Sequence, residues 1–307
     1  RRAPSARAGR PLISGLTARR AQAPDADHAM TSDKARYWLL ALPALAVMVI
    51  FYIWPLASIW AISVTEPELG FGNYVRGAES QAVTTSFVIT FRVAALTTVF
   101  CVILGYICAY AIANTIRRAK PLLIALVLLP FWVSVLIRSF SWIVLLGRSG
   151  IVNDALRDVG VIERPLRLMH NEFGVVLAMV HVMLPFAVLP LLANMRGISP
   201  AYTDAARGLG ASELTAFRLV YMPQTLPGIG SAALLVFVLS LGFYITPALL
   251  GGGRVLMVSE YITYQIQEFL NWGLGSALSV ALLVATALVL VIAGRFLNLK
   301  NALLERN

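Results

Sequence analysis

Charged residues are scarce in this sequence of 307 residues, and that scarcity excludes most classes of soluble protein. Asp, Glu, Lys and Arg make up 13% of the chain and hydrophobic residues 59%, with a mean hydropathy of +0.78. Globular chains contain about 25% charged residues. Several runs of 18 residues or more carry no charge, which is typical of transmembrane helices. The composition excludes a soluble enzyme, a disordered chain and a disulfide-stapled secreted domain, and it indicates an all-α polytopic membrane protein.

Cysteines and catalytic motifs are also few. Cys101 and Cys108 are the two cysteines, and both lie in one uncharged run. Seven residues of helix rise about 10 Å, whereas a disulfide needs Cα atoms within about 7 Å, so we interpret both as unpaired apolar residues. The sequence has no glycine-rich loop ending in Gly-Lys-Ser/Thr, no Gly-x-Ser-x-Gly and no His-Glu-x-x-His. We therefore expect no catalytic residue, metal or cofactor in this chain, and no nucleic-acid partner.

What the chain does contain is a series of long apolar segments. A basic tail over 1–36 has no hydrophobic periodicity and is predicted to be disordered. A six-helix domain is predicted over 37–297, followed by a tail over 298–307. Residues 64–84 are predicted to form a loop, and residues 147–171 an extramembrane insert with a short amphipathic helix. The six predicted spans are 37–63, 93–113, 121–142, 173–194, 225–250 and 269–294.

The distribution of basic residues predicts the orientation. Six spans place both termini on one side of the membrane. That side would carry 17 basic and 6 acidic residues, against 7 basic and 9 acidic on the other. Because basic residues accumulate in cytoplasmic segments, we predict that both termini are cytoplasmic and that the chain is a multi-pass protein of the bacterial inner membrane.

None of the six predicted spans contains Asp or Glu. A carrier coupled to protons or sodium usually keeps such a carboxylate inside the membrane, so a stand-alone secondary transporter is the less favoured alternative. Arg138 lies near the end of a predicted span, where a snorkelling side chain is favoured over a pathway role. For His181, in mid-span, a neutral side chain hydrogen-bonded to a neighbouring helix is favoured over a proton shuttle. An integral membrane enzyme is disfavoured because no nucleophile, base or metal constellation is present.

The segment 195–224 is too polar to span and too long to be a turn. Ser199 and Pro200 are typical of a helix start, and the helix should end near Gly208–Gly210 because glycine tolerates the left-handed conformation. Ser212 then caps a second short helix that is predicted to run to Pro223. Two interpretations fit equally from these features alone: a protruding knob that docks in a partner's groove, or a surface loop that lies on the membrane.

The same segment resembles the EAA loop of permeases of ABC importers. That pattern is Glu-Ala-Ala, three residues, Gly, nine residues and Ile-x-Leu-Pro, and the spacing fits throughout with three mild substitutions. Surrounding stretches such as LPFAVLPLL and PQTLPGIGSAALLVF resemble the spermidine/putrescine-type branch. The likeness covers about residues 37–297. The residues that match the motif are Asp204, Ala205, Ala206, Gly210, Val220, Met222 and Pro223.

The resemblance implies a type I ABC importer permease fold and a set of partners. A second permease would pair with this chain, and a cytoplasmic ATPase dimer would bind ATP and Mg and dock on the EAA loop. A periplasmic solute-binding protein would deliver the solute. Because Asp204 stands where the family has Glu, its usual contact with the ATPase is not assured. The second permease could be another copy or a different chain.

A polyamine is the solute that the resemblance favours, with other amines, opines and phosphonates as alternatives within the class. A slender cation calls for carboxylates and aromatic faces, and with no acid in the spans the carboxylates must come from the outer rim. Aromatic residues at such positions are more often packing or interface residues. The candidate pathway residues are Glu172, Phe243, Tyr244, Glu260, Glu268 and Trp272.

Overall fold

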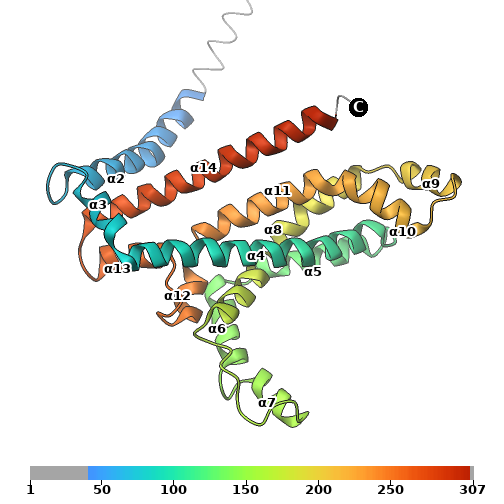
Figure 1. Cartoon of the computed structure of the whole chain (residues 1–307), viewed down its shortest axis with the longest axis horizontal. Helices are drawn as coiled ribbons and strands as arrows, with labels where there is room; N and C mark the ends of the chain where they lie inside the picture. Colours follow the sequence, from blue (N-terminus) through green and yellow to red (C-terminus); the bar gives the residue numbers. More distant parts are fainter. Residues whose placement is uncertain (1–40, 305–307) are drawn as a thin grey trace, which may run out of the picture. The chain divides into compact units, whose positions relative to one another are not determined.

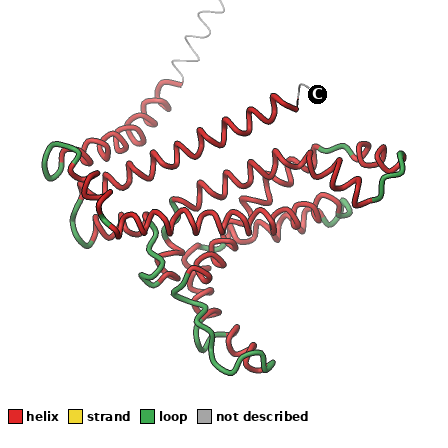
Figure 2. Tube along the Cα trace, viewed as in Figure 1, coloured by secondary structure: helices red, strands yellow, loops and turns green. Residues whose placement is uncertain are grey.

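The computed structural model describes residues 41–304, and every regular element in that range is a helix (Figures 1 and 2). The chain divides into two compact units, residues 1–56 and residues 57–307. The predictions for the tail over 1–36 and for the start of the first span lie outside the described residues. The labelled elements are η1 (Val49–Ile53), α2 (Trp54–Thr65), α3 (Gly72–Glu79), α4 (Gln81–Asn114), α5 (Lys120–Trp132), α6 (Val135–Leu146), α7 (Ile151–Asp158), α8 (Glu172–Gly197), α9 (Pro200–Gly208), α10 (Glu213–Ala216), η2 (Phe217–Tyr221), α11 (Met222–Leu241), α12 (Ile245–Gly251), α13 (Val258–Gln267) and α14 (Trp272–Leu304).

Six helical segments among the described residues are long and apolar enough to cross a membrane, which confirms the predicted number of spans. The first, fourth and sixth overlap the predicted spans closely, and the second contains the predicted span but begins earlier. The third and fifth differ from the prediction in ways that bear on function. The six segments are Ala41–Thr65, Gln81–Asn114, Val135–Asp158, Glu172–Gly197, Glu213–Leu241 and Trp272–Arg295.

The loop predicted over 64–84 is only partly a loop. It contains α3, and α4 begins twelve residues earlier than the apolar run at Val93 indicated. The cause is a polar cap that the hydropathy profile does not register: the hydroxyl of Ser80 accepts a hydrogen bond from the backbone N–H of Val83 at 3.5 Å. At 34 residues, α4 is about 51 Å long, which exceeds the roughly 30 Å of a bilayer's hydrocarbon core.

The predicted third span, 121–142, is wrong as a single helix. The apolar helix α5 contains Pro130 and ends at Trp132, Val133 is extended, and α6 starts again with Ser134 as its cap. The Ser134 hydroxyl accepts a hydrogen bond from the N–H of Leu136 at 3.3 Å. A proline followed by a serine cap ends one helix and begins another, although both sides of the break are equally apolar. The predicted amphipathic helix of the insert is present as α7.

The predicted fifth span, 225–250, is displaced. The helix that crosses here begins at Glu213 and ends at Leu241. A non-helical break follows over residues 242–244, and the short helix α12 then takes up the rest of the predicted span. The apolar run continues through the break, so hydropathy alone gave no sign of it.

The core of the second unit lies where α4, α8 and α11 pack side by side (Figure 1). Residues of α8 make the largest contribution to this core, among them Met179, Met183 and Leu191. Gly105 permits the close approach of α4 and α8, because a Cβ at that position would lie 3.0 Å from the Cβ of Ala187. The cysteines are free, as predicted, and the Cys101 thiol donates to the backbone carbonyl of Val180 at 3.6 Å.

His181 has the environment that the sequence analysis favoured. The indole N–H of Trp142 in α6 donates to Nδ1 of His181 in α8 at 3.2 Å, and the two rings meet edge to face. A ring nitrogen that accepts a hydrogen bond carries no proton, so this geometry fits a neutral imidazole. The contact ties α6 to the core.

Candidate functional site

The segment between α8 and α11 begins with the short helix that the sequence predicts. The Ser199 hydroxyl accepts a hydrogen bond from the N–H of Ala201 at 3.4 Å, and Pro200 occupies the first turn of α9. The helix ends at Gly208. Gly210 follows with φ of +89°, a conformation that favours glycine. Both the predicted cap and the predicted glycine corner are confirmed.

The second predicted helix does not stop at Pro223. Ser212 caps it as expected, accepting from the N–H of Thr215 at 3.3 Å. The chain then continues from α10 through the π-helical turn η2 directly into α11, so that residues Glu213–Leu241 form one uninterrupted helix. The wide turn of a π-helix accommodates a proline, which has no N–H to donate to the preceding turn. The second arm of the corner is therefore the start of a spanning helix rather than a separate element.

One arginine joins the two arms of the corner. Arg207 in α9 lies 3.6 Å from a carboxylate oxygen of Asp204 and 3.6 Å from one of Glu213. Because all three side chains are exposed, these pairs add little stability. Their effect is to hold the two helices at the glycine corner in a preferred arrangement.

The motif residues lie on the surface of this corner. Asp204 and Ala205 on α9 are exposed and Ala206 is half-buried, while Met222 and Pro223 are exposed on α11 and Val220 is half-buried in η2. Leu209, at the tip, is 91% exposed. Large apolar side chains grouped on an exposed corner mark an interaction site. The others in this group are Tyr202, Leu214, Leu219 and Met222.

An aromatic cluster connects the corner to the core. The rings of Phe217 and Tyr221 in η2 stack at 5.7 Å, and each meets the ring of Tyr110 in α4 edge to face, at 5.4 and 5.5 Å. Such aromatic pairs contribute about 0.5–1.5 kcal/mol beyond their buried area. The corner is thereby in contact with α4 as well as continuous with α11.

A cavity of about 450 Å³ lies at the break after α11. Phe243 and Tyr244, two of the predicted pathway residues, line it together with Phe131 and Phe186 from α5 and α8. Arg138 also lines this cavity. Its Nε and Nη1 atoms are buried and have no hydrogen-bond partner among the described residues. The prediction that Arg138 snorkels from a helix end is therefore wrong: it lies in the first turn of α6, because the helix breaks just before it.

Glu260 is buried in the first turn of α13 and is not a residue of an exposed outer rim. Its side chain is 2% exposed, Oε1 accepts a hydrogen bond from the Tyr264 hydroxyl at 3.2 Å, and Oε2 has no partner among the described residues. Burial raises the pKa of Glu260 above its ordinary value, and the hydrogen bond from Tyr264 lowers it by less. The neighbouring Ser259 hydroxyl donates to the carbonyl of Phe243 at 2.8 Å, which ties α13 to the break.

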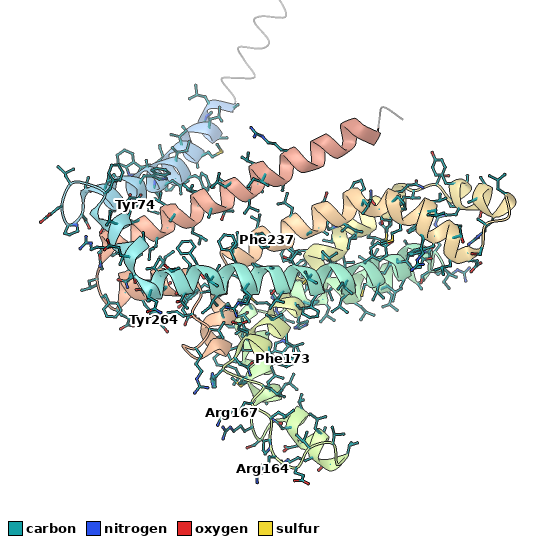
Figure 3. All side chains as sticks on the ribbon, in the orientation of Figure 1. Tyr74, Arg164, Arg167, Phe173, Phe237 and Tyr264 are labelled. Atoms are coloured by element: carbon teal, nitrogen blue, oxygen red, sulfur yellow. The ribbon has the colours of Figure 1, made fainter. Side chains whose placement is uncertain are left out.

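Tyr264 of α13, labelled in Figure 3, interacts electrostatically with several of the predicted residues. Its pKa is raised chiefly by the negative charge of Glu260, then by burial, and to a smaller extent by Tyr244 and Glu268. Tyr264 was not predicted from the sequence. Its position four residues after Glu260, on the same face of a helix, is the signal that could have identified it.

Two predicted pathway residues lie elsewhere. Glu172, at the start of α8, forms an ion pair with Arg92 of α4 at 3.1 Å, which joins these two helices. Trp272 is exposed at the start of α14. Tyr264 and Ser259 thus link Phe243 and Tyr244 to Glu260 of α13 and to Glu268, which follows α13, whereas Glu172 and Trp272 lie outside that group.

Comparison with known proteins agrees with this architecture. Residues 117–301, more than half of the chain, match the family described as "Binding-protein-dependent transport system inner membrane component". The chain belongs to this family. It is an inner-membrane permease component of a transport system that depends on a binding protein, and not the stand-alone carrier considered as an alternative.

Similar proteins include two permeases of known systems. The spermidine/putrescine transport system permease protein PotB of Haemophilus influenzae is 36% identical over 210 residues, which cover 68% of this chain and 73% of that protein. PotB of Escherichia coli K12 is 34% identical over 212 residues, covering 68% and 77%. The fold matches a chain of a bacterial ABC transporter that imports the acidic polysaccharide alginate, with a TM-score of 0.72, 18% identity and coverage of 88% and 98%.

Proposed function

We propose that this chain forms one half of the translocation pathway of an ATP-driven importer and that partner ATPases act on it through the corner at residues 195–224. The observation that carries the proposal is the exposed apolar corner, held by Ser199, Gly210 and Ser212 and continuous with a spanning helix. An ATPase dimer would bind ATP and Mg, and this chain would supply no catalytic group. A second permease would complete the pathway, and a periplasmic protein would deliver the solute.

Loss of ATPase binding on two substitutions tests the docking role. Gly210→Pro cannot keep φ near +89°, because proline fixes φ near −65°. Ala206→Glu places a bulky charge on the flank of α9. We expect each variant to fold, insert and lose co-purification with the ATPase. Val161→Glu is the matched control, since Val161 is exposed on the insert far along the chain from the corner. Retention of the ATPase by both corner variants would contradict the proposal.

For the solute we propose a small amine of the polyamine type. The support is the group formed by Phe243, Tyr244, Glu260 and Glu268, together with the names of the PotB relatives. Aromatic rings attract cations by about 0.5–2 kcal/mol each, and a buried carboxylate with one free oxygen can bind an ammonium group. Glu172 and Trp272, which lie outside this group, remain proposed as residues of the outer approach.

Measurements of solute binding and of uptake distinguish a polyamine from the other solutes of the class. Spermidine, putrescine and an opine should be titrated against the solute-binding protein of this system, and the tightest binder used for uptake. Tyr244→Ala and Glu260→Gln should each reduce uptake and solute-stimulated ATP hydrolysis. Glu163→Gln, an exposed carboxylate on the insert, should leave both unchanged. If uptake is intact in both pathway variants, the proposed route is wrong.

A further inference from the structure

One cavity is lined by several basic residues and lies away from both the corner and the break. It has a volume of about 620 Å³ and lies where the end of α6, the segment before α8 and the connection from α12 to α13 meet. Arg148, Arg167 and Arg254 line it together with His170, and no acidic residue is among its lining residues. Figure 3 shows Arg167 on the segment between α7 and α8.

A buried asparagine fixes two walls of this cavity. Asn153 in α7 is fully buried, and its amide donates to the carbonyls of Gly147 and Leu166 at 2.9 and 3.1 Å. Its side-chain oxygen accepts from the N–H of Leu166 at 2.8 Å. These bonds hold the residues next to Arg148 and Arg167 in register with each other. A satisfied buried amide of this kind specifies one arrangement of the chain.

The third wall is attached through His170 and Gly252. The N–H of His170 donates to the carbonyl of Leu250 at 3.0 Å. Gly252 has φ of +56° and lies so close to the imidazole that a Cβ there would be 2.1 Å from Nδ1. Only glycine fits this contact, which positions Arg254 two residues further on. The three arginines are thus presented by a preformed framework, and preformed sites bind with less entropic cost.

The charges in this cavity have no partner within the described residues. None of the three arginines takes part in an ion pair there, whereas Arg157, on the nearby α7, pairs with Asp154. In the proposed orientation these arginines lie on the outer face, where basic residues are depleted. The three arginines are exposed, and three like charges around one cavity favour an acidic ligand over a neutral or basic one.

We infer that this cavity receives one or more acidic side chains of the solute-binding protein and so positions that protein on the permease. The inference rests on the proposed function. Guanidinium groups bind carboxylates through paired hydrogen bonds, and complementary charge accelerates association. Exposed apolar residues on and after α7, Ile151, Val159 and Val161, lie on the same insert. Apolar residues beside charged ones are typical of a protein–protein interface, which favours a protein over a lipid headgroup.

Charge reversal tests the inference in the assembled transporter. The permease complex with its ATPase is reconstituted in nanodiscs of phosphatidylcholine, and the dissociation constant of the purified solute-binding protein is measured at several salt concentrations. Arg167→Glu and Arg254→Glu should each weaken binding by about tenfold or more and flatten its salt dependence. Arg164→Glu is the matched control, because Arg164 is an exposed arginine of the same segment (Figure 3) that does not line the cavity. It should change binding by less than about twofold.

The remaining outcomes are decisive. Unchanged affinity in both cavity variants overturns the inference. It is also overturned if those variants bind the protein normally but lose a preference for phosphatidylglycerol nanodiscs, since the cavity would then be a lipid site. Reversal of an acidic residue on the binding protein should restore binding to Arg254→Glu. If the binding protein fails to bind even the unaltered complex, the proposed function itself is wrong. This result differs from normal binding by the cavity variants, which overturns only the inference about the cavity.

Discussion

Glu260 carries a carboxyl group of which only one oxygen has a partner among the described residues. Burial disfavours its charged form, so its pKa in the folded chain lies above that in the unfolded chain. A carboxyl with a raised pKa binds more protons in the folded state than in the unfolded one. Stability is therefore greatest below the ordinary pKa of a glutamate and falls as the pH rises through the raised value.

Glu260→Gln should accordingly stabilise the permease at neutral pH. The amide keeps the shape and the acceptor for Tyr264 but cannot ionise, so we expect a melting temperature about 2 °C higher at pH 7 and a weaker dependence on pH between 4 and 8. Thermal unfolding in detergent measures this directly. Glu268→Gln, at an exposed position, should show no such change. A lower melting temperature at pH 7 for Glu260→Gln would show that the charged form is stabilised in the fold.

The environment of Arg138 could not be predicted from the sequence, because it depends on a helix break that the sequence did not indicate. Its snorkelling was inferred from its distance to the end of a span that does not exist as one helix. His181, in contrast, was interpreted correctly, because the cost of an unpaired ring nitrogen in a core depends little on where helices end. A prediction for a side chain is as reliable as the element boundary on which it depends.

At the scale of elements, the sequence predicted the helices with polar boundaries and missed the breaks inside apolar runs. Ser199, Gly210 and Ser212 were placed correctly because caps and glycine corners act through a few local hydrogen bonds and φ angles. The breaks at 133–134 and 242–244 lie between equally apolar stretches, so a hydropathy profile does not reveal them. The break at 242–244 lies at the cavity that Phe243 and Tyr244 line. The sequence identified these two residues as pathway candidates, but it predicted an unbroken span over 225–250.

The uninterrupted helix from Glu213 to Leu241 leads to a prediction about coupling. If force passes from the corner into the membrane along this helix, flexibility inserted directly after the corner should uncouple the two ends. Two glycines inserted between Gln224 and Thr225 remove helical rigidity without altering α9 or the motif residues. We expect the ATPase to co-purify as before and ATP-driven uptake to fall to background.

The same insertion at another site is the control. Two glycines after Glu68, in the exposed connection between α2 and α3, should leave uptake close to that of the unaltered chain. Uptake that survives the insertion after Gln224 would show that this helix does not carry the coupling. The aromatic contacts of Tyr110 with Phe217 and Tyr221 would then be the remaining connection to the core.

At the scale of the whole molecule, the corner and the basic cavity lie at opposite ends of α8. The corner follows Gly197 and the cavity precedes Glu172, and 26 residues of helix separate them by about 39 Å. That distance exceeds the hydrocarbon thickness of a bilayer. Two docking surfaces on one chain can therefore face two compartments. An importer requires this arrangement if it receives solute from a binding protein on one side and is driven by an ATPase on the other.

The orientation of these two ends is a prediction from charge alone, and cysteine labelling tests it. Basic residues outnumber acidic ones by 17 to 6 on the side of the corner and are outnumbered on the other. Leu209→Cys and Val161→Cys introduce thiols at exposed positions at the two ends. With a membrane-impermeant maleimide, Val161→Cys should label in intact spheroplasts and Leu209→Cys only after lysis. The unaltered chain, with Cys101 buried and Cys108 half-buried, sets the background. The reverse pattern would place the corner outside, where no ATPase could reach it, and the coupling proposal would fail with the orientation.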